Sequence, residues 1–499
     1  MTTDHGPQVF TNFGRDVQFQ ARHAYRPESE AEVLEALDRH RGQRIRAVGS
    51  MHSWSETPAE TDVVLDLGGL RHLDVRPDPD GRSAVVTVGA GCRLRDLLTR
   101  LHAQSHFTVP TLGAITQQRI AGVVSTATHG SGNHSFSHYM DRIRIASYDP
   151  ATGRARATDY RDGPELRAAR CALGCLGPIL EVSFRVVLKY AVSEEIRRRP
   201  SIADILAEAA DFPLQQIVVM PHVWAFYQYR RRVEPMGLGG VGMRVKARLY
   251  RWYKFLGIDV GFHATIKALT AATAVARWDA PVRWFYRAVV PWTVLRRFRV
   301  TDESTHALTL RHDLFTHTEM ELFVPAAHVP AATQMLRDLI DLGAGVSKDL
   351  PADTAQRLTT FDLLTAARAL AGTYTHHYPL IFRRVLPDDA LIAMTADATD
   401  SYYTMSLFTF RRPGPAWAQF THLVATAFAR LFAARLHWGK YFPLEPAEYA
   451  HLYPHLPAFR DLCRAADPAG AFRNAFARRA LGFDEPATAP TGEPPCTPP

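Results

Sequence analysis

Three short segments contain the side chains of this 499-residue chain that are best suited to chemistry. The first is VGSMHS at 48–53, where a predicted buried strand ends in a tight turn that is followed by a histidine. Glycine and small residues let the backbone come close to a ligand, and the imidazole of His52 then points toward whatever the backbone holds. Taken alone, a histidine is more often structural than catalytic.

The second segment has few bulky side chains and includes TLGA at 111–114, IAG at 120–122 and STATHGSG at 125–132. Backbone N–H groups in such a run can line a flat or anionic ligand such as a pyrophosphate. The spacing matches neither GxGxxG nor the P-loop, so neither common phosphate motif applies. The third segment is HWGK at 437–440, which places a cation beside a histidine.

Alternating short elements must position these segments. Residues 43–187 alternate predicted strands with short helices, and residues 190–415 predict a sheet with covering helices. These patterns predict an α+β protein. We expect an N-terminal domain at 16–190, a second domain at 191–415, a mostly helical segment at 416–483 and a Pro-rich, disordered tail at 484–499.

Composition narrows the class of protein. The start of the chain lacks the basic and apolar regions of a secretory signal, and no stretch of 18 apolar residues is free of charge. Five cysteines, an odd and small number, argue against a disulfide framework and favour a reducing compartment. We expect a cytoplasmic protein with no metal site, and no motif for binding nucleic acid is present.

Together the three segments resemble the vanillyl-alcohol-oxidase-type (PCMH-type) flavoproteins, in the branch of sugar-1,4-lactone and alditol oxidases. RIRAVGSMHSWSE at 44–56 is similar to the family's strand and turn with the flavin-linking histidine. LGAITQQRIAGVVSTATHGSG at 112–132 is similar to the family's flavin-facing loop, and LGCLGPILEVSFRV closes the domain. MELFVPAAHV, DDALIAM, HWGK and DPAGAFRNAF follow in family order, whereas the insertion at 236–300 and the tail are not covered.

The resemblance implies a two-domain fold: an FAD-binding domain at 16–190 and a substrate-binding cap domain, built on a large antiparallel sheet, at 191–415. The segment at 416–483 then returns to the FAD domain. His52 matches the histidine that bonds covalently to the flavin 8α-methyl group. The full set of implied FAD-binding residues is His52, Gly49, Ser50, Met51, Ser53, Gly113, Ala114, Gly122, Ser125, Thr128, His129, Gly130 and Ile179.

Three residues are the implied catalytic candidates. Lys440 matches a lysine near the flavin N1 and the substrate oxygen, where a cation stabilises the charge of reduced flavin. Arg383 matches an active-site arginine that binds a substrate oxygen. His437 is the neighbour of Lys440 in the HWGK segment. The corresponding structural interpretations are a surface lysine, a strand arginine in a surface ion pair and a packing histidine.

Three departures from the family pattern bear on the substrate. Ile381 occupies the position of a family glutamate two residues before the arginine, and Ala114 replaces a serine of the alditol branch. Met405 or Leu407 stands where a substrate-facing histidine is expected. A pocket that loses hydroxyl-binding groups binds polyols poorly, so we expect a less polar alcohol or a lipid-like substrate.

The missing glutamate leaves the proton acceptor open. Lys440, His437 or a tyrosine such as Tyr402 or Tyr403 are the alternatives.

Gly113 lies where related dehydrogenases carry a bulkier residue over the flavin. Glycine leaves that face open, so we expect an oxidase that takes hydride from a CH–OH group and reduces O2 to H2O2. The alternatives are a dehydrogenase with a quinone or protein acceptor, and a flavin-binding protein with little oxidase activity. In a third interpretation, Gly113 only serves the turn.

The predicted insertion at 236–300 is basic and aromatic. Residues 230–299 contain 15 Lys and Arg against three acids, although the whole chain has a net charge of only +8. A solvated charged surface, an anionic partner and peripheral contact with an anionic membrane are the three interpretations of this pattern.

Overall fold

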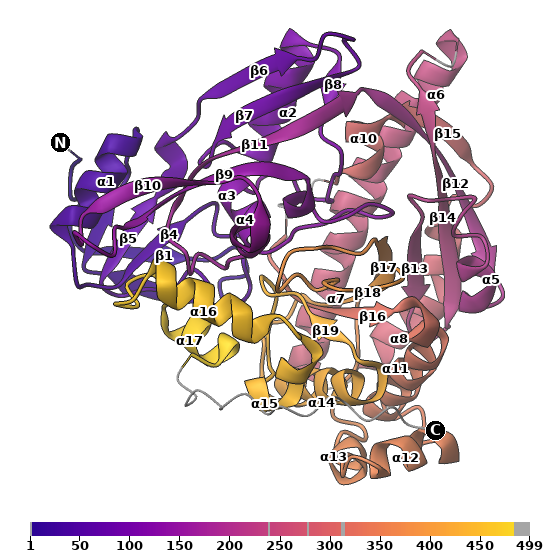
Figure 1. The fold of residues 1–499 in the computed structure, drawn as a ribbon. Helices are drawn as coiled ribbons and strands as arrows, with labels where there is room; N and C mark the ends of the chain where they lie inside the picture. Colours follow the sequence, from indigo (N-terminus) through magenta and orange to yellow (C-terminus); the bar gives the residue numbers. More distant parts are fainter. Residues whose placement is uncertain (1, 238–239, 277–278, 311–314, 484–499) are drawn as a thin grey trace.

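The computed structural model describes residues 2–237, 240–276, 279–310 and 315–483, so the predicted tail at 484–499 lies outside the described residues. Two large sheets dominate the molecule (Figure 1). The mixture of these sheets with helices confirms the predicted α+β class.

The N-terminal part of the chain contains a parallel three-stranded sheet and an antiparallel six-stranded sheet. The first has the order β3-β5-β4, with bounds His23–Tyr25, Val63–Asp66 and Ile45–Val48. The second has the order β10-β9-β11-β7-β6, with bounds Ala155–Tyr160, Met140–Tyr148, Ile179–Leu188, Ser83–Gly89 and Leu73–Pro77, and β8 (Phe107–Thr108) pairs with β11. Helices α1 (Glu30–Arg39), α2 (Leu94–Gln104), α3 (Ile120–Ser125) and α4 (Gly163–Ala169) bury their apolar faces here.

The second part is an antiparallel sheet of eight strands in the order β15-β12-β14-β13-β17-β18-β16-β19. Their bounds are Arg299–Glu303, Tyr190–Arg199, Ala225–Pro235, Gln216–Met220, Leu380–Val385, Tyr402–Thr409, Thr318–Pro325 and Arg435–Leu436. Strand β17 ends at Val385, and the chain then turns away from the sheet.

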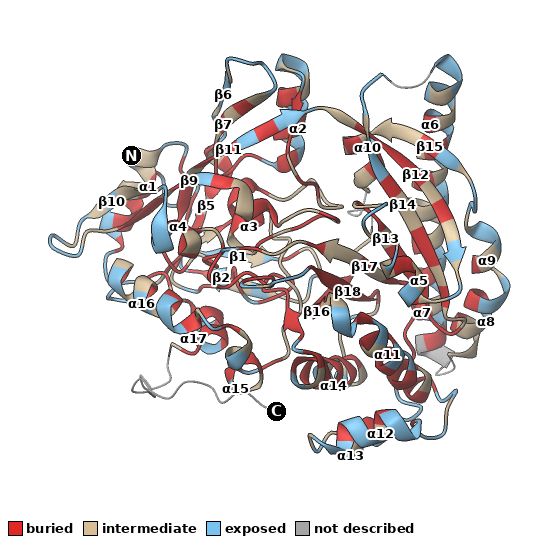
Figure 2. Cartoon of the chain, turned by 45° about the vertical axis from the view of Figure 1, so that its right-hand side comes forward, coloured by how far each residue is buried: buried red, intermediate tan, exposed pale blue. Residues whose placement is uncertain are grey.

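Helices cover both faces of this sheet. On one face, α11 (Val329–Gly343) and α14 (Pro415–Phe432) contact β16. On the other face, α7 (His263–Ala276) and α8 (Ala280–Ala288) contribute Ile266 and Phe285 to an apolar cluster with Val218 and Phe408. Buried residues therefore line both sides of the sheet, as the burial colours show (Figure 2).

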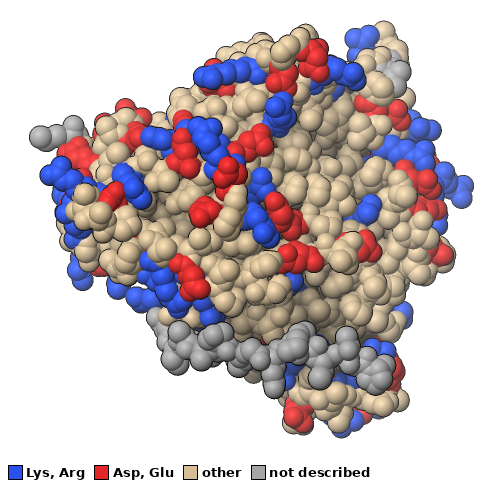
Figure 3. All heavy atoms as spheres, viewed as in Figure 1, with Lys and Arg blue, Asp and Glu red and all other residues tan. Residues whose placement is uncertain are grey.

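Within the described residues, the basic segment at 236–300 is mostly helical. It comprises α6 (Val241–Tyr253), a π-helical stretch at Lys254–Phe262, α7, α8 and α9 (Val290–Thr293). On the visible face of the molecule, blue and red side chains are interspersed, so the positive net charge does not form one broad field there (Figure 3).

The C-terminal helical segment divides between the two parts. Helix α14 and strand β19 stay with the eight-stranded sheet, whereas α16 (Leu456–Ala466) packs against α4 of the N-terminal part. Short helix α15 (Pro446–Tyr449) lies between them and contacts both α14 and α17 (Ala475–Leu481). In Figure 1 this yellow segment runs beneath the N-terminal part.

Candidate functional site

A cavity lies between residues of the N-terminal part and residues of the eight-stranded sheet. It is lined by all three catalytic candidates, Lys440, Arg383 and His437. It is also lined by twelve of the predicted FAD-binding residues: His52, Gly49, Ser50, Met51, Ser53, Gly113, Ala114, Gly122, Ser125, Thr128, His129 and Ile179. The structure thus brings together residues that are up to about 390 positions apart in the sequence.

Gly130 is the one predicted FAD-binding residue that does not line the cavity. A Cβ atom on Gly130 would lie 2.3 Å from the carbonyl oxygen of Leu112. The glycine is therefore needed for two backbone segments to pass close to each other, and its direct role in binding FAD stays a prediction.

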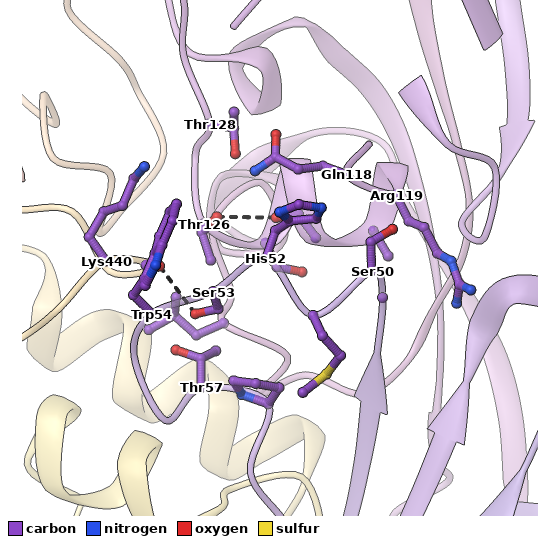
Figure 4. Close-up of a pocket in the computed structure, with 18 of the residues that line it drawn as sticks. Ser50, His52, Ser53, Trp54, Thr57, Gln118, Arg119, Thr126, Thr128 and Lys440 are labelled. Atoms are coloured by element: carbon purple, nitrogen blue, oxygen red, sulfur yellow. Dashed lines mark hydrogen bonds between the residues drawn. The ribbon is translucent and has the colours of Figure 1, made fainter. Parts of the chain in front are cut away.

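His52 lies in the loop that follows β4, with its ring beside the cavity (Figure 4). The preceding residue, Met51, has φ +56°, a left-handed conformation that is costly for a non-glycine residue and is common at functional sites. The Ser50 hydroxyl donates to the Gln117 carbonyl over 2.7 Å, and the ring of Phe13 stacks on the imidazole at 5.0 Å. These contacts fix the direction of the His52 side chain.

The loop at 112–132, which resembles the family's flavin-facing loop, presents backbone groups to the cavity. A Cβ atom on Gly122 would meet nothing within 4 Å, so this glycine faces open space. A Cβ atom on Gly113 would lie 3.1 Å from the His129 carbonyl oxygen. Among the described residues, the buried hydroxyl of Thr128 has no hydrogen-bond partner, so the cavity wall offers a polar group to a ligand.

The HWGK turn is attached directly to the His52 loop. The backbone N–H of Trp54 donates to the Gly439 carbonyl over 2.9 Å, and the Ser55 hydroxyl donates to the Trp438 carbonyl over 2.7 Å. Trp438 is fully buried, and its indole N–H donates to the Ile392 carbonyl over 2.7 Å. The turn therefore holds Lys440 in a fixed place beside the loop of His52, with its ammonium 4.4 Å from the centre of the Trp54 ring.

Two buried carboxylates line the cavity that were not among the predicted site residues. Glu319 forms an ion pair with Lys440, and Glu321 lies 3.4 Å from Nε2 of His129. The Ser406 hydroxyl donates to Glu321 over 3.0 Å. Both glutamates alternate with apolar residues in TEMELFVP, and this pattern in a buried strand is the signal that could have identified them.

Burial and neighbouring charges set the ionisation of this group. Burial opposes ionisation of both carboxylates, and it raises the pKa of Glu319 despite its ion pair with Lys440. For Glu321, the nearby His129, together with Lys440 and His437, outweighs burial and holds the pKa well below its usual value. Burial also lowers the pKa of His437 to about 3, so this histidine is neutral at physiological pH.

The structure corrects the expected wall at β18. Met405 and Leu407 are fully buried in the core cluster that includes residues of α11 and α14. Because neighbouring residues in a strand face opposite sides, Ser406 and Phe408 instead face the cavity side. Tyr402 and Tyr403, two alternatives for the proton acceptor, are not among the residues that line the cavity. Ala114 lines the cavity, whereas Ile381 pairs with Ser406 and is not among the lining residues.

The residues present fit an anionic, flat cofactor such as FAD. Glycines expose the backbone, Thr128 offers a hydroxyl without a partner among the described residues, and Lys440 and Arg383 provide positive charge. Arg119 also lines the cavity. Its guanidinium forms an ion pair with Asp66 and packs closely against Gly68, and these contacts hold its side chain in place.

Comparisons with known proteins agree with this site. The sequence matches the FAD binding domain family over residues 21–155 and the D-arabinono-1,4-lactone oxidase family over residues 248–480. The second match begins inside the segment 236–300, so most of the predicted insertion is within the family region, contrary to expectation.

Close and distant relatives extend over nearly the whole chain. A protein described as a long-chain alcohol oxidase, from an uncultured marine euryarchaeote, is 40% identical over 475 residues, which are 95% of this chain and 97% of that protein. The L-gulono-1,4-lactone dehydrogenase of Mycobacterium tuberculosis (strain ATCC 25618 / H37Rv) is 26% identical, over 92% of this chain and 95% of that protein. The crystal structure of a cholesterol oxidase from B. sterolicum has the same fold, with a TM-score of 0.72, 14% identity and coverage of 96% and 97%.

The fold and site define an FAD-dependent oxidoreductase of the PCMH-type class that acts on CH–OH groups. Within that class, the chain belongs to the family of FAD-linked alcohol and lactone oxidases that includes the D-arabinono-1,4-lactone oxidases, as the resemblance predicted. Within the described residues, no helix is long and apolar enough to span a bilayer.

Proposed function

We propose that this protein is an oxidase of long-chain, lipid-like primary alcohols, with O2 as the electron acceptor and H2O2 as a product. The observation that carries the proposal is a series of aromatic side chains that begins at the cavity. Phe408 lines the cavity and contacts the ring of Tyr378, with ring centres 5.0 Å apart, and Tyr378 contacts Phe262 at 5.8 Å. Phe262 in turn contacts Phe285 of α8 at 5.9 Å, so an aromatic series connects the cavity to the basic helical segment.

The relatives support an apolar substrate. The protein that is 40% identical to this chain is described as a long-chain alcohol oxidase, whereas the lactone-oxidising relatives are less similar. At position 381 the sheet presents isoleucine in place of an acid, beside Val218 on the neighbouring strand. An isoleucine there offers no hydrogen-bond partner to the hydroxyls of a sugar lactone, which disfavours lactones as substrates.

We further propose that His52 bonds covalently to the flavin and that the residues predicted to bind FAD hold it in the cavity. The flavin, when bound, supplies the acceptor for the hydride of the alcohol C–H bond. Lys440 and Arg383 would then stabilise negative charge on the reduced cofactor and on the substrate oxygen. Gly113 lines the cavity without a side chain, which favours an oxidase over a dehydrogenase.

A third part of the proposal concerns delivery of the substrate: the basic helical segment contacts an anionic membrane. Of fourteen large hydrophobic side chains that are exposed in the described part of the chain, nine lie between residues 236 and 295. Along α6 and its continuation, these are Val241, Val245, Leu249, Trp252 and Leu256. Their spacing of three or four residues places them on one stripe of the helix, flanked by Arg244 and Arg248, as expected of an interfacial helix.

Anaerobic reduction of the bound flavin tests the substrate assignment. We expect primary alcohols to bleach the flavin absorbance faster as the chain lengthens from hexanol to hexadecanol, while L-gulono-1,4-lactone and D-arabinono-1,4-lactone do not bleach it. Faster bleaching by the lactones, or by the shorter alcohols, would contradict a long-chain alcohol as the substrate. Mixing the reduced enzyme with O2 or with a soluble quinone then identifies the acceptor, and slow reoxidation by O2 alone would support a dehydrogenase.

A further inference from the structure

Glu319 places a buried carboxylate in the candidate site, and it was not among the predicted catalytic residues. It is 2% exposed, lines the cavity and forms its ion pair with Lys440, the cation expected beside the flavin. Glu319 and Glu321 are two residues apart on β16, so both project from the same face of the sheet. On the neighbouring strand, Glu319 is paired with Phe408, which also lines the cavity.

The strand register relates Glu319 to the acid that is missing at position 381. Ile381 of β17 pairs with Ser406 of β18, and Ser406 pairs with Glu321 of β16. These three residues therefore form one row across the sheet, and Glu319 belongs to the adjacent row on the same face. The carboxylate that is absent from β17 thus has a counterpart two strands away, on the same face of the same sheet.

We propose that Glu319 accepts the hydroxyl proton of the substrate alcohol, a proposal that rests on the proposed oxidase function. In the reaction, the carbon–hydrogen bond breaks and its electron pair leaves with the hydrogen to the bound flavin. The oxygen–hydrogen bond breaks as well, its proton passes to the Glu319 carboxylate, and the carbon–oxygen bond becomes a carbonyl. The proton is later released from Glu319 to water, so the carboxylate is regenerated for the next cycle.

The groups around Glu319 suit this task. Lys440, Glu321 and Arg383 are the charged groups that act on its ionisation, and Tyr378 is a further titratable neighbour. Burial raises the pKa of Glu319 above its ordinary value of 4.5, which makes it a stronger base than an exposed carboxylate. His437 is a poorer candidate, because its Nδ1 accepts a hydrogen bond from the Gly439 N–H over 3.0 Å and burial keeps it a weak base.

Flavin reduction by hexadecanol in Glu319→Gln tests the proposal. We expect the rate constant of reduction to fall by about 100-fold or more, the usual contribution of a general base. We also expect the acidic limb of the pH profile, which reflects protonation of the base in the wild type, to disappear. A variant that reduces flavin at the wild-type rate with an unchanged pH profile would overturn the proposal.

Glu194→Gln is the matched control, because Glu194 is also a buried strand glutamate in an ion pair, 2.6 Å from Arg231, but does not line the cavity. It should lower stability without moving the pH profile. A rescue variant, Glu319→Gln with Ile381→Glu, puts a carboxylate back at position 381. We expect the double variant to reduce flavin at least ten times faster than Glu319→Gln alone. Ile381→Gln in the same background should give no increase in this rate constant.

The pH dependence of thermal unfolding gives a readout that needs no substrate. When folding raises the pKa of a carboxyl group, the folded protein holds the proton more tightly than the unfolded chain does. The free energy of unfolding therefore falls as the pH rises from 4.5 through the raised pKa of Glu319. The melting temperature of the wild type should therefore decline over this range more steeply than that of Glu319→Gln. Parallel curves would contradict a basic Glu319 even if no alcohol reduced the flavin, whereas failure of the alcohols alone would refute only the oxidase proposal.

Discussion

At the scale of single residues, the most informative position is His52. Its backbone neighbour Met51 is held in a left-handed conformation, and its ring is stacked between the cavity and Phe13. A conformation that costs of order 1–3 kcal/mol is retained only where the surrounding structure requires it. The loop is therefore built to direct the imidazole into the cavity, which is the geometry that a covalent bond to a cofactor needs.

Acid precipitation tests the proposed bond. In the wild type the yellow colour should stay in the protein pellet, and in His52→Ala it should move to the supernatant. His222→Ala is a suitable control, because His222 is also buried but does not line the cavity, and this variant should keep its flavin in the pellet. Flavin in the wild-type supernatant would refute the covalent bond but leave the cofactor assignment intact.

At the scale of elements, α6 has two apolar faces, one of which is buried and the other exposed. Its inner face buries Ala247 and Tyr250, and the Tyr250 hydroxyl donates to Glu194 of β12 over 2.6 Å. Its outer stripe remains exposed: Leu249 is 64% and Trp252 is 53% exposed. Exposed apolar stripes beside basic residues are unusual on a monomeric surface, and Figure 2 shows α6, α8 and α9 at the outer edge of the sheet.

Co-sedimentation with lipid vesicles tests the proposed membrane contact. We expect binding to phosphatidylglycerol vesicles, weaker binding to phosphatidylcholine vesicles and weakening by salt. Leu249→Glu or Trp252→Glu should reduce binding by about tenfold or more, since each removes a side chain worth about 1.5–3 kcal/mol of burial. Val9→Glu is the control, because Val9 is an exposed valine of strand β1 (Gln8–Thr11), and this variant should bind vesicles as the wild type does. Equal binding by all four proteins would exclude α6 as the contact.

At the scale of the whole molecule, a charged contact joins the two sheet-bearing parts. His138 follows the 112–132 loop, and its Nδ1 lies 3.6 Å from Asp388 and 3.4 Å from Asp389, which follow β17. The two nearby carboxylates, of Asp388 and Asp389, raise the pKa of His138 to about 9. A raised histidine pKa stabilises the folded state fully below pH 6.5, and this contribution is lost as the pH rises toward 9.

Melting temperatures measured between pH 6 and pH 9.5 test this contact. The wild type should lose stability across that range, and His138→Gln should be less stable at pH 6 but lose less as the pH rises. His23→Gln removes the partner of Asp4 in a more exposed pair and serves as the control. If the difference between wild type and His138→Gln were constant with pH, charge on His138 would not be the cause.

The sequence by itself indicated FAD as the cofactor, the α+β class and three of the segments that line the cavity. Segments such as 48–53, 112–132 and 437–440 are recognisable because their function needs local features: small residues, a tight turn and a chemically distinctive side chain. Gly130 shows the limit, because a glycine needed for ligand approach and one needed for close chain packing look the same in sequence.

Only the tertiary structure decided which strand residues face the cavity. Shifting a strand by one residue exchanges its two faces, so Ser406 and Phe408 could not be distinguished from Met405 and Leu407 without the pairing register. The same reason hid Glu319: its partner Lys440 is 121 residues away, and the two meet only because β16 pairs with β19 just before the HWGK turn. Long-range strand pairing, which no local pattern encodes, thus placed the proposed proton acceptor beside its cation.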